Sequence, residues 1–584
     1  MKYQLNSNQD YKVKGSIFTV IKKFRPLLSG EKSRLILALT ALLINSGLNL
    51  TIPLIIGKTI DQYITTKQYQ GVLFNSFWLL LMYFGTLIAT YFQTKNMGTV
   101  GQHLLYNLRN SIFTKIQNLP MAFFNQNKTG DLISRINNDT DNLNQFFSQA
   151  LVQFVANIFL MVGAAGFILF LDWRLGLWAL APALGIVIFT QLLTSILRQK
   201  NTKSLQSVGN MSAEIAESLD NFKVVVAFNR QDYFQSHFQS VNDTNYKNAL
   251  SAGFLNNIFT PVYYLASHIA QIIVLFYGIY LVSIGNLTIG LLIGYLTYVS
   301  RFYDPIRQIA GLWASFQTAL GSYDRISEIL NLHSDLSIEK TTENTSSSDP
   351  VLAFKNVSFH YPDGQNVLTK INFELLPSKT YAMVGPTGGG KTTTASLMSR
   401  LFDPTSGHVL LHGRDLKTYT PGELSQKIGF ILQEPYLFSG TVAQNLIYGN
   451  PNLSESNLVD VLKQKKLDKL VSRFDQGLDT KIANASETIS LGQKQIVAFL
   501  RAVLRQPDIL ILDEATANID TVTEQILEEI LNRLPSTTTK VIIAHRLNTI
   551  ENADEIFFVN GGSVTPAGSL DHALEMLMEN KRES

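Results

Sequence analysis

Six long apolar runs lie within the first 330 residues, and they constrain the fold of this chain more than any other feature. A helix needs about 20 mostly apolar residues to cross a bilayer core about 30 Å thick. One such run alone could be a buried core helix, but six in series predict a membrane domain of six transmembrane helices. The predicted spans are Leu35–Ile56, Val72–Phe92, Ala150–Leu171, Leu175–Leu197, Ile258–Val282 and Ile289 to about Ile309.

The spacers between these runs alternate in length and charge. The first, third and fifth are short, whereas the second and fourth are long and rich in lysine and arginine, such as Arg109 and Arg230. Because basic loops stay on the cytoplasmic side, we expect a multi-pass protein of the cell membrane with both termini in the cytoplasm. The long spacers are expected to be helices that continue beyond the bilayer. Each ends in an apolar patch, Met121–Leu132 or Ser218–Phe228, which either presses a short helix against a cytoplasmic domain or packs as a loop.

Charged residues are scarce inside the predicted spans. Arg301 and Asp304 in the sixth span are exceptions, and Pro305 beside them predicts a kink. Arg301 lies about 18 Å along the helix from Ile289, inside the inner leaflet. It either lines a wet cavity as a functional residue or pairs with Asp304 one turn away. The other polar residues of the spans that we expect to form interhelical hydrogen bonds are Asn45, Asn49, His268 and Gln271.

Composition excludes several classes of site and partner. The chain has no cysteine, which excludes disulfides, thiol catalysis and Cys-ligated zinc. Its net charge of +3 gives no support for a nucleic-acid partner. Residues 1–33 are basic and lack a signal-peptide core, and Ser16–Leu28 is either an interfacial helix or a solvated tail. A polar linker, 331–350, is expected to separate the membrane domain, 34–330, from a soluble domain, 351–584.

The segment GPTGGGKTT fits the phosphate-binding loop pattern G-x-x-x-x-G-K-[ST]. Glycines let the backbone N–H groups surround a phosphate chain, Lys391 would reach the β- and γ-phosphates, and the Thr392 hydroxyl would hold Mg²⁺. An apolar strand leads in and a helix-like run leads out, as this loop requires. The segment therefore predicts that ATP or GTP is bound by Gly385, Pro386, Thr387, Gly388, Gly389, Gly390, Lys391, Thr392 and Thr393.

The soluble half alternates short apolar strands with helices, which is typical of an α/β domain with a largely parallel sheet. The expected strands are Val351–Phe354, Thr380–Val384, Ile428–Leu432, Ile509–Leu512, Val541–Ala544 and Glu555–Val559. The predicted fold class is thus an all-α membrane domain of six helices fused to a cytoplasmic α/β nucleotide-binding domain.

Acidic residues follow the predicted strand Ile509–Leu512. Because ligands of α/β sheets bind at the carboxyl ends of strands, Asp513 is expected to hold Mg²⁺ through water together with Thr392. Glu514 comes next and suits a base that orients or deprotonates the attacking water.

Three further side chains are candidates at the same site. Gln433 ends one strand and has the reach to meet Mg²⁺ or the attacking water, and His545 ends another and could touch the γ-phosphate. Tyr361, in FHYP, offers an aromatic face on which a purine ring could stack.

Together these motifs and the six-helix order resemble an ATP-binding cassette (ABC) exporter half-transporter over nearly the whole chain. The resemblance implies an adenine-stacking aromatic at Tyr361, a Q-loop at Gln433, Walker B and a catalytic glutamate at Asp513 and Glu514, a D-loop at 518–520 and a switch histidine at His545. The patches near Asn127 and Asp220 fall where the family's coupling helices lie. Two such subunits would sandwich two ATP molecules with Mg²⁺ and move a small molecule, lipid or peptide across the bilayer.

One motif departs from the family pattern. Where the family carries L-S-G-G-Q, this chain reads Ile489-Ser490-Leu491-Gly492-Gln493. In the family this segment opens a helix that binds the γ-phosphate held by the other subunit, so Ser490, Gly492 and Gln493 are expected to contribute there. Leu491 puts a branched side chain where glycine lets the backbone approach the phosphate. The preceding residues, 482–486, also lack the glycines and glutamate that are usual there.

We interpret this departure as one half of a non-equivalent pair of ATP sites, rather than neutral drift. It favours a heterodimer with a second half-transporter that has an intact signature. The alternatives are a homodimeric exporter, an importer, and an ATP-gated channel or regulatory protein of the same fold. The motifs do not identify the cargo.

Overall fold

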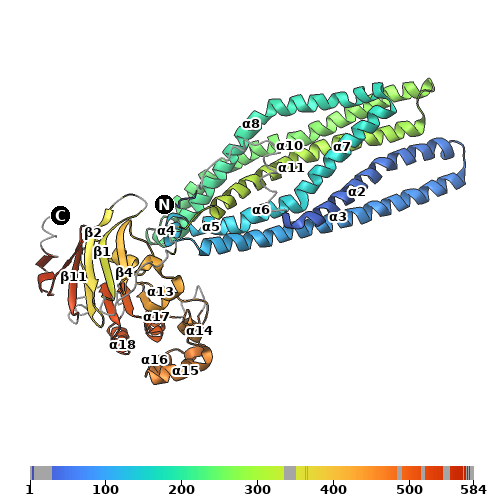
Figure 1. The fold of residues 1–584 in the computed structure, drawn as a ribbon. Helices are drawn as coiled ribbons and strands as arrows, with labels where there is room; N and C mark the ends of the chain where they lie inside the picture. Colours follow the sequence, from blue (N-terminus) through green and yellow to red (C-terminus); the bar gives the residue numbers. More distant parts are fainter. Residues whose placement is uncertain are drawn as a thin grey trace. The chain divides into compact units, whose positions relative to one another are not determined.

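The computed structural model describes residues 3–5, 29–334, 338, 350–361, 364, 366–482, 489–513, 520–543, 553–569, 571–573, 575–576 and 578. The chain divides into two compact units, each visible in Figure 1. The helical unit comprises residues 6–116 and 130–331, and the second unit combines residues 1–5, 117–129 and 332–584.

Very long helices build the helical unit. They are α2 (Lys32–Thr59), α3 (Tyr69–Gln117), α7 (Leu151–Leu171), α8 (Trp173–Asp220), α10 (Gln231–Ser283) and α11 (Ile289–Leu330). Helices α3, α8 and α10 contain 49, 48 and 53 residues, far more than the 20 or so needed to span a bilayer. The predicted continuation of the helices beyond the bilayer is therefore confirmed.

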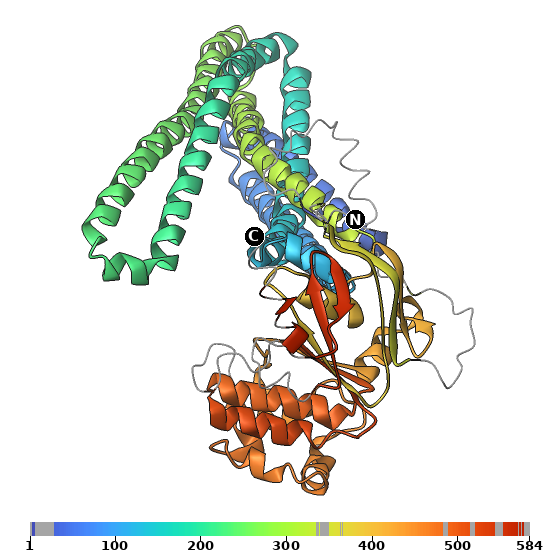
Figure 2. The ribbon, with the colours of Figure 1, turned by 90° about the vertical axis from the view of Figure 1, so that its left-hand side faces the viewer.

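Shorter helical segments connect these long helices. Helix α9 (Phe222–Ala227) joins α8 to α10 at the tip of a long hairpin, which is clearly visible in Figure 2. A continuous run of short segments leads into α7: α5 (Thr129–Ser134), the π-helix η3 (Arg135–Asp139), α6 (Thr140–Gln145) and the π-helix η4 (Phe146–Ala150). The 3₁₀ turn η1 (Ser29–Glu31) precedes α2, and the π-helix η2 (Ile60–Ile64) follows it.

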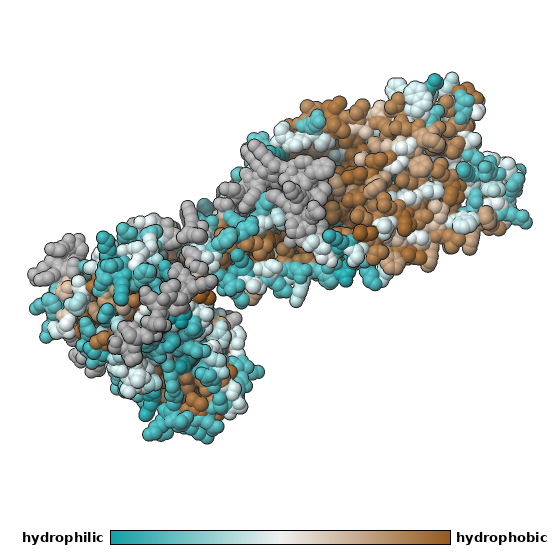
Figure 3. Space-filling model, in the orientation of Figure 1, coloured by the Kyte–Doolittle hydropathy of each residue, from teal (hydrophilic) through white to brown (hydrophobic). Residues whose placement is uncertain are grey.

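Five helical segments in the described part of the chain are long and apolar enough to cross a membrane. Exposed apolar side chains cover much of the face of these helices that Figure 3 shows. The sixth predicted span, inside α11, is not among the five. Arg301, Asp304 and Pro305 interrupt its apolar stretch, although α11 is a continuous helix that packs on α2, α7 and α10.

Three fully buried tyrosines fix the rotation of α11. The hydroxyl of Tyr295 donates to the carbonyl of Ile168 at 2.8 Å, and that of Tyr303 donates to the carbonyl of Ala179 at 2.8 Å. The hydroxyl of Tyr298 donates to a carbonyl of α2. A buried phenol needs such an acceptor, so these bonds hold one face of α11 against α2, α7 and α8. The opposite face of α11 is turned away from that core.

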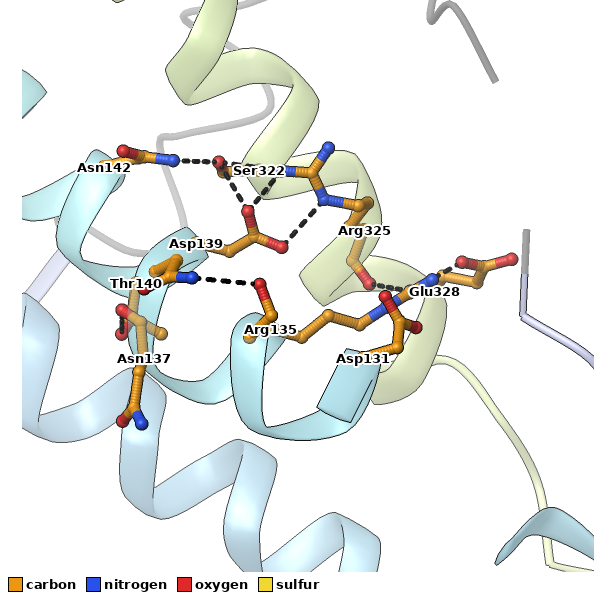
Figure 4. A network of polar contacts seen from close by, with 11 residues as sticks. Asp131, Arg135, Asn137, Asp139, Thr140, Asn142, Ser322, Arg325 and Glu328 are labelled. Carbon is orange, nitrogen blue, oxygen red and sulfur yellow. Dashed lines mark hydrogen bonds and ion pairs between the residues drawn. The ribbon is translucent and has the colours of Figure 1, made fainter. Parts of the chain in front are cut away.

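A network of charged residues joins η3 to the last turns of α11 (Figure 4). Arg135 is only 1% exposed and donates to Asp131 Oδ2 at 2.9 Å, Glu328 Oε2 at 2.8 Å and the carbonyl of Arg325 at 2.9 Å. Asp139 accepts from Arg325 Nε at 2.8 Å and from the Ser322 hydroxyl at 2.9 Å. We refer to Asp131, Arg135, Asp139, Ser322, Arg325 and Glu328 as the polar clamp.

Two larger sheets form the centre of the second unit. The strands are β1 (Leu352–His360), β2 (Asn366–Leu375), β3 (Thr380–Val384), β4 (Ser406–Leu411), β5 (Arg414–Asp415), β6 (Ile428–Ile431), β7 (Gly440–Thr441), β8 (Lys481–Ile482), β9 (Ile509–Asp513), β10 (Thr539–Ile543), β11 (Glu555–Asn560) and β12 (Ser563–Pro566). One sheet has the order β12-β11-β3-β10-β9-β6 and is parallel except for β12, as predicted. The other, β2-β1-β4-β5, is antiparallel, and only the first residues of β1 were expected from the sequence.

Helices cover these sheets. They are α12 (Lys391–Met398), α13 (Pro421–Lys427), α14 (Val442–Ile447), α15 (Glu455–Gln464), α16 (Asp468–Val471), α17 (Leu491–Arg505) and α18 (Thr521–Leu531), with 3₁₀ turns at Leu416–Thr418 and Gly477–Asp479. One apolar cluster lies between the two large sheets and a second lies among α14 to α18 and the far side of the parallel sheet. The strand predicted at Ile428–Leu432 ends one residue earlier, at Ile431, and Leu432 is exposed. The last residue of the strand predicted at Val541–Ala544, Ala544, lies outside the described residues.

Residues before the first long helix also contribute to the second unit. Tyr3 is buried beside the short helix α4 (Met121–Gln126), and its backbone N–H donates to Gln126 Oε1 at 2.8 Å. Asn127 Nδ2 donates to the carbonyl of Tyr3 at 2.9 Å and Asn127 Oδ1 accepts from Leu5 N at 2.9 Å. Residues 3–5 are therefore packed, whereas Ser16–Leu28, predicted to be either an interfacial helix or a solvated tail, lies outside the described residues.

Candidate nucleotide-binding site

The loop between β3 and α12 has, at several positions, a backbone conformation that residues with a side chain rarely adopt. Gly385, Gly388 and Gly390 have φ angles of 151°, 82° and 110°. A Cβ atom on Gly385 would lie 2.0 Å from the carbonyl oxygen of Val559, and one on Gly389 would lie 2.6 Å from the same oxygen. The loop is thus pressed against β11, and its glycines leave room for a phosphate chain over the backbone N–H groups.

The lysine of the loop folds back over it. Lys391 begins α12 and is 5% exposed, and its Nζ donates to the carbonyls of Gly385 at 2.9 Å and Pro386 at 3.0 Å. The ammonium group and the N-terminal end of α12 therefore place positive charge at the same loop. This combination binds phosphate groups.

Two oxygen ligands lie together at the end of the parallel sheet. The Thr392 hydroxyl is 3.4 Å from Asp513 Oδ1, and Asp513 is the last residue of β9. Hard oxygen donors of this kind suit Mg²⁺, which also takes phosphate oxygens and water as ligands. The residues present therefore fit a magnesium–nucleotide complex.

The order of the strands brings the carboxyl ends of β6, β9 and β10 to this edge. Ile431 of β6 pairs with Leu512 of β9, so β6 ends at the same edge as Asp513, and Gln433 follows two residues later. Ile543 of β10 pairs with Asp513 in the same way. Two predicted residues follow directly in the chain: Glu514 after Asp513, and His545 two positions after Ile543. Both lie outside the described residues, as do 518 and 519 of the predicted D-loop.

Tyr361 lies next to the first turn of α12. Its hydroxyl is 3.1 Å from Thr393 Oγ1, and its ring meets the rings of Phe359 and Phe402 edge to face, at centroid distances of 4.9 and 5.6 Å. These contacts hold the ring beside the phosphate loop, where a purine attached to a bound phosphate chain could stack on it.

The predicted signature segment, residues 489–493, contains the start of α17, whereas the phosphate loop precedes α12. The Ser490 hydroxyl accepts from Gln493 N at 3.2 Å, and Gln493 Oε1 accepts from Ser490 N at 3.0 Å. This reciprocal capping box uses both side chains within this chain. Leu491 is the first residue of the helix and is 40% exposed. The segment from 483 to 488 lies outside the described residues.

Gly492 packs against α18, a contact that the motif alone did not reveal. A Cβ atom on Gly492 would lie 3.1 Å from Thr523 Oγ1. Thr523 is itself fixed, because its N–H and hydroxyl donate to the Asp520 carboxylate at 2.9 and 2.7 Å. These hydrogen bonds hold the pKa of Asp520 below its usual range. The pattern Asp-x-x-Thr at a helix start could have indicated this cap from the sequence.

Comparison with known proteins covers both units. Residues 35–306 match the family model of the ABC transporter transmembrane region, and residues 368–517 match that of the ABC transporter. An uncharacterised ABC transporter ATP-binding protein of Bacillus subtilis is 30% identical over 95% of this chain and 92% of its own length. A multidrug resistance ABC transporter ATP-binding and permease protein of Lactococcus lactis is 30% identical over 94% and 93%. A fatty acid ABC transporter ATP-binding/permease protein of Mycobacterium tuberculosis is 30% identical over 84% and 77%.

Proposed function

This chain belongs to the ABC transporter family as an exporter half-transporter, and from this premise we propose that it works as one subunit of a heterodimer with two unequal ATP sites. Members of this family are multi-pass membrane proteins that couple ATP hydrolysis to transport. Beyond this family function, we assign the ATP site to which this chain contributes its hydrolytic residues and the kind of partner subunit that it needs.

At its own phosphate loop the chain would carry a full set of hydrolytic residues. The loop Gly385–Thr393 would hold the phosphates and Tyr361 the adenine ring. Thr392, Asp513 and Gln433 would hold Mg²⁺, which neutralises phosphate charge when bound. Glu514 would act as the base toward water, and His545 would contact the γ-phosphate.

The signature segment is the reason that we expect the two ATP sites to differ. In a nucleotide sandwich the start of α17 faces the phosphates held by the partner subunit. Ser490 already caps the helix, so the remaining donors are the backbone N–H groups of its first turn. The exposed side chain of Leu491 stands beside those groups and keeps a phosphate at a distance. A homodimer would therefore have two impaired sites despite a complete Glu514 set.

We further propose that residues 1–33, 34–330, 331–350 and 351–584 form the cytoplasmic N-terminal segment, membrane domain, linker and nucleotide-binding domain. Both termini then lie in the cytoplasm, as the basic long spacers indicate. The names of two relatives, for fatty acid and multidrug transport, favour a hydrophobic or amphipathic cargo.

The test is to measure ATPase activity of this chain alone and co-purified with a membrane–cassette fusion whose signature is intact. The chain alone should be slow, and Leu491→Gly should raise its activity roughly tenfold or more, because one charged hydrogen bond contributes about 1.5–3 kcal/mol. Val522→Gly is the matched control, since it removes an exposed branched side chain from the first turn of α18. Full ATPase and transport by the unaltered chain as a homodimer would refute the proposal. ATP-dependent current without uphill flux would instead indicate a channel.

A further inference from the structure

One face of α11 carries polar side chains that the described residues cover only in part. Ser300, Arg301, Asp304, Arg307 and Gln308 share that face, because residues three, four and seven apart align on a helix. Asp304 and Gln308 are exposed, and the two arginines are half-buried. The buried tyrosines on the opposite side of α11 fix this orientation.

The two arginines on this face have unused hydrogen-bond donors. Arg301 Nη1 donates to Asn49 Oδ1 at 3.1 Å, and the guanidinium of Arg307 lies 5.4 Å from the ring centre of Tyr264. The Nε atoms of both are buried without a hydrogen-bond partner in the described part of the chain. No ion pair with a described residue satisfies either charge, so the pairing of Arg301 with Asp304 that the sequence left open is not formed.

The depth of the two arginines in the predicted membrane span limits what can surround their charges. Arg301 and Arg307 follow Ile289 by 12 and 18 residues, which places them about 18 and 27 Å along a span of about 30 Å. An arginine facing lipid near the middle of a helix costs about 2.5–3.5 kcal/mol. Arg307 is close enough to the end of the span to reach the interface, whereas Arg301 lies deeper, so the face around Arg301 must line an aqueous cavity or a second helix bundle. Unused guanidinium donors in such a place select an acceptor that carries negative charge.

Neutral hydrogen-bonding groups continue the polar face in both directions. Gln271 Nε2 donates to Ser300 Oγ at 3.0 Å, and Asn157 Nδ2 donates to Gln308 Oε1 at 3.1 Å. A cavity of about 430 Å³ then opens between α11 and the run from α6 to α7. Its polar lining consists of Asn142, Gln145, Gln149, Gln153, Ser315 and Thr318. This lining binds polar groups without adding charge, so Arg301, Arg307 and Asp304 set the charge preference.

We propose that Arg301 and Arg307 form the headgroup site for an anionic amphiphile, the cargo of the export function on which this inference rests. The headgroup is a carboxylate or phosphate attached to an alkyl or acyl chain. The two arginines are six residues apart, which is about 9 Å along the helix axis and about 120° around it, so their long side chains must converge from the two edges of the face to reach one headgroup. Guanidinium groups bind both headgroups through paired hydrogen bonds. Asp304 lies between them and leaves the face with a net charge of +1, which favours a headgroup with one negative charge.

Binding of four matched compounds to the assembled transporter tests this inference. Dodecanoate, dodecyl phosphate, dodecanol and dodecyltrimethylammonium share one alkyl chain and differ in charge, and each would compete with a dansyl-labelled fatty acid. At least one anion should bind about tenfold more tightly than dodecanol, corresponding to 1.4 kcal/mol. The comparison of dodecanoate with dodecyl phosphate identifies the headgroup.

Arginine variants assign the preference to the site. Arg301→Gln and Arg307→Gln should each lower the preference for the anion about fivefold, whereas Arg301→Lys should retain most of it because it retains the charge. Arg174→Gln is the control, since Arg174 lies beside Trp173 much as Arg307 lies beside Tyr264 but is outside this face. Equal affinity for all four compounds, or an unchanged preference in the folded double glutamine variant, would overturn the inference.

Flux into proteoliposomes separates this inference from the export function. ATP-driven movement of the anion supports both. Movement of dodecanol or the cation without any preference for the anions would overturn the inference and leave export intact. Selective binding without ATP-driven flux of any of the four compounds would overturn the assignment of the anion as cargo, and export itself is then decided by the ATPase and transport test of the proposed function.

Discussion

Alanine substitutions in the phosphate loop should have graded effects, because its glycines are required for different reasons. At Gly385 a Cβ atom would lie 2.0 Å from the Val559 carbonyl oxygen, and φ is 151°. At Gly388 φ is 82°, but a Cβ atom would have no atom within 4 Å. Gly422, at the start of α13, has open space and no such φ. We expect Gly385→Ala to be severe, Gly388→Ala moderate and Gly422→Ala neutral.

The expected loss of binding free energy has two contributions, backbone strain and overpacking. A left-handed φ costs a residue with a side chain about 1–2 kcal/mol. Overpacking against neighbouring atoms that cannot move adds about 1–3 kcal/mol. Gly388→Ala carries only the first term and should weaken nucleotide binding by about 5- to 30-fold if the empty loop relaxes and binding must impose the whole strain again. Gly385→Ala carries both terms, about 2–5 kcal/mol, and should weaken binding by at least about 30-fold.

The assay is the Kd of a fluorescent ATP analogue for the purified transporter, with thermal unfolding measured on the same samples. Gly422→Ala controls for substitution of glycine in an open helix, where alanine is the better helix former. If Gly385→Ala binds nucleotide as well as Gly388→Ala does, the contact of the loop with β11 is not what the structure describes.

Two further predictions concern the nucleotide-binding domain. Glu514→Gln should leave ATP binding intact but lower steady-state hydrolysis by roughly 10²-fold, as expected for loss of a general base, and turnover within about threefold of the parent would contradict that role. Gln495 is fully buried and neither atom of its amide has a hydrogen-bond partner in the described part of the chain. Gln495→Met should therefore stabilise the protein by about 1–3 kcal/mol in thermal unfolding, whereas the exposed Gln464→Met should have no effect.

The features that the sequence predicted well depend on neighbours in the chain. Strand β3 has the predicted bounds, Thr380–Val384, because a short apolar run followed by glycine is a local signal. The five apolar spans are likewise set by length and composition. The sixth shows the limit of that signal, since Arg301 and Asp304 lower its apolarity while the buried tyrosines of α11 keep it in the bundle.

What could not be predicted depends on pairs distant in the sequence. Nothing local in the sequence distinguishes Arg135 from the other basic residues of its long spacer, yet it is buried against Glu328, 193 positions away. The antiparallel partner of β1 was missed because β2 alternates exposed and buried residues and has no continuous apolar run. The capping box of Ser490 and Gln493, in contrast, had a local signal in the pattern S-x-x-Q.

The polar clamp has a consequence for the timing of cargo release. Arg325 in the clamp and Arg307 on the polar face belong to the same helix, 18 residues or about 27 Å apart. Pro305 provides no N–H for the carbonyl of Arg301, so α11 is weakest between the two arginines. Arg301 is also held from α2 through Asn49. A rotation that begins at the clamp therefore carries Arg307 with it while Arg301 stays in place. Torsion of a single helix would then change the spacing of the two charges, and with it the residence time of an anion bound between them.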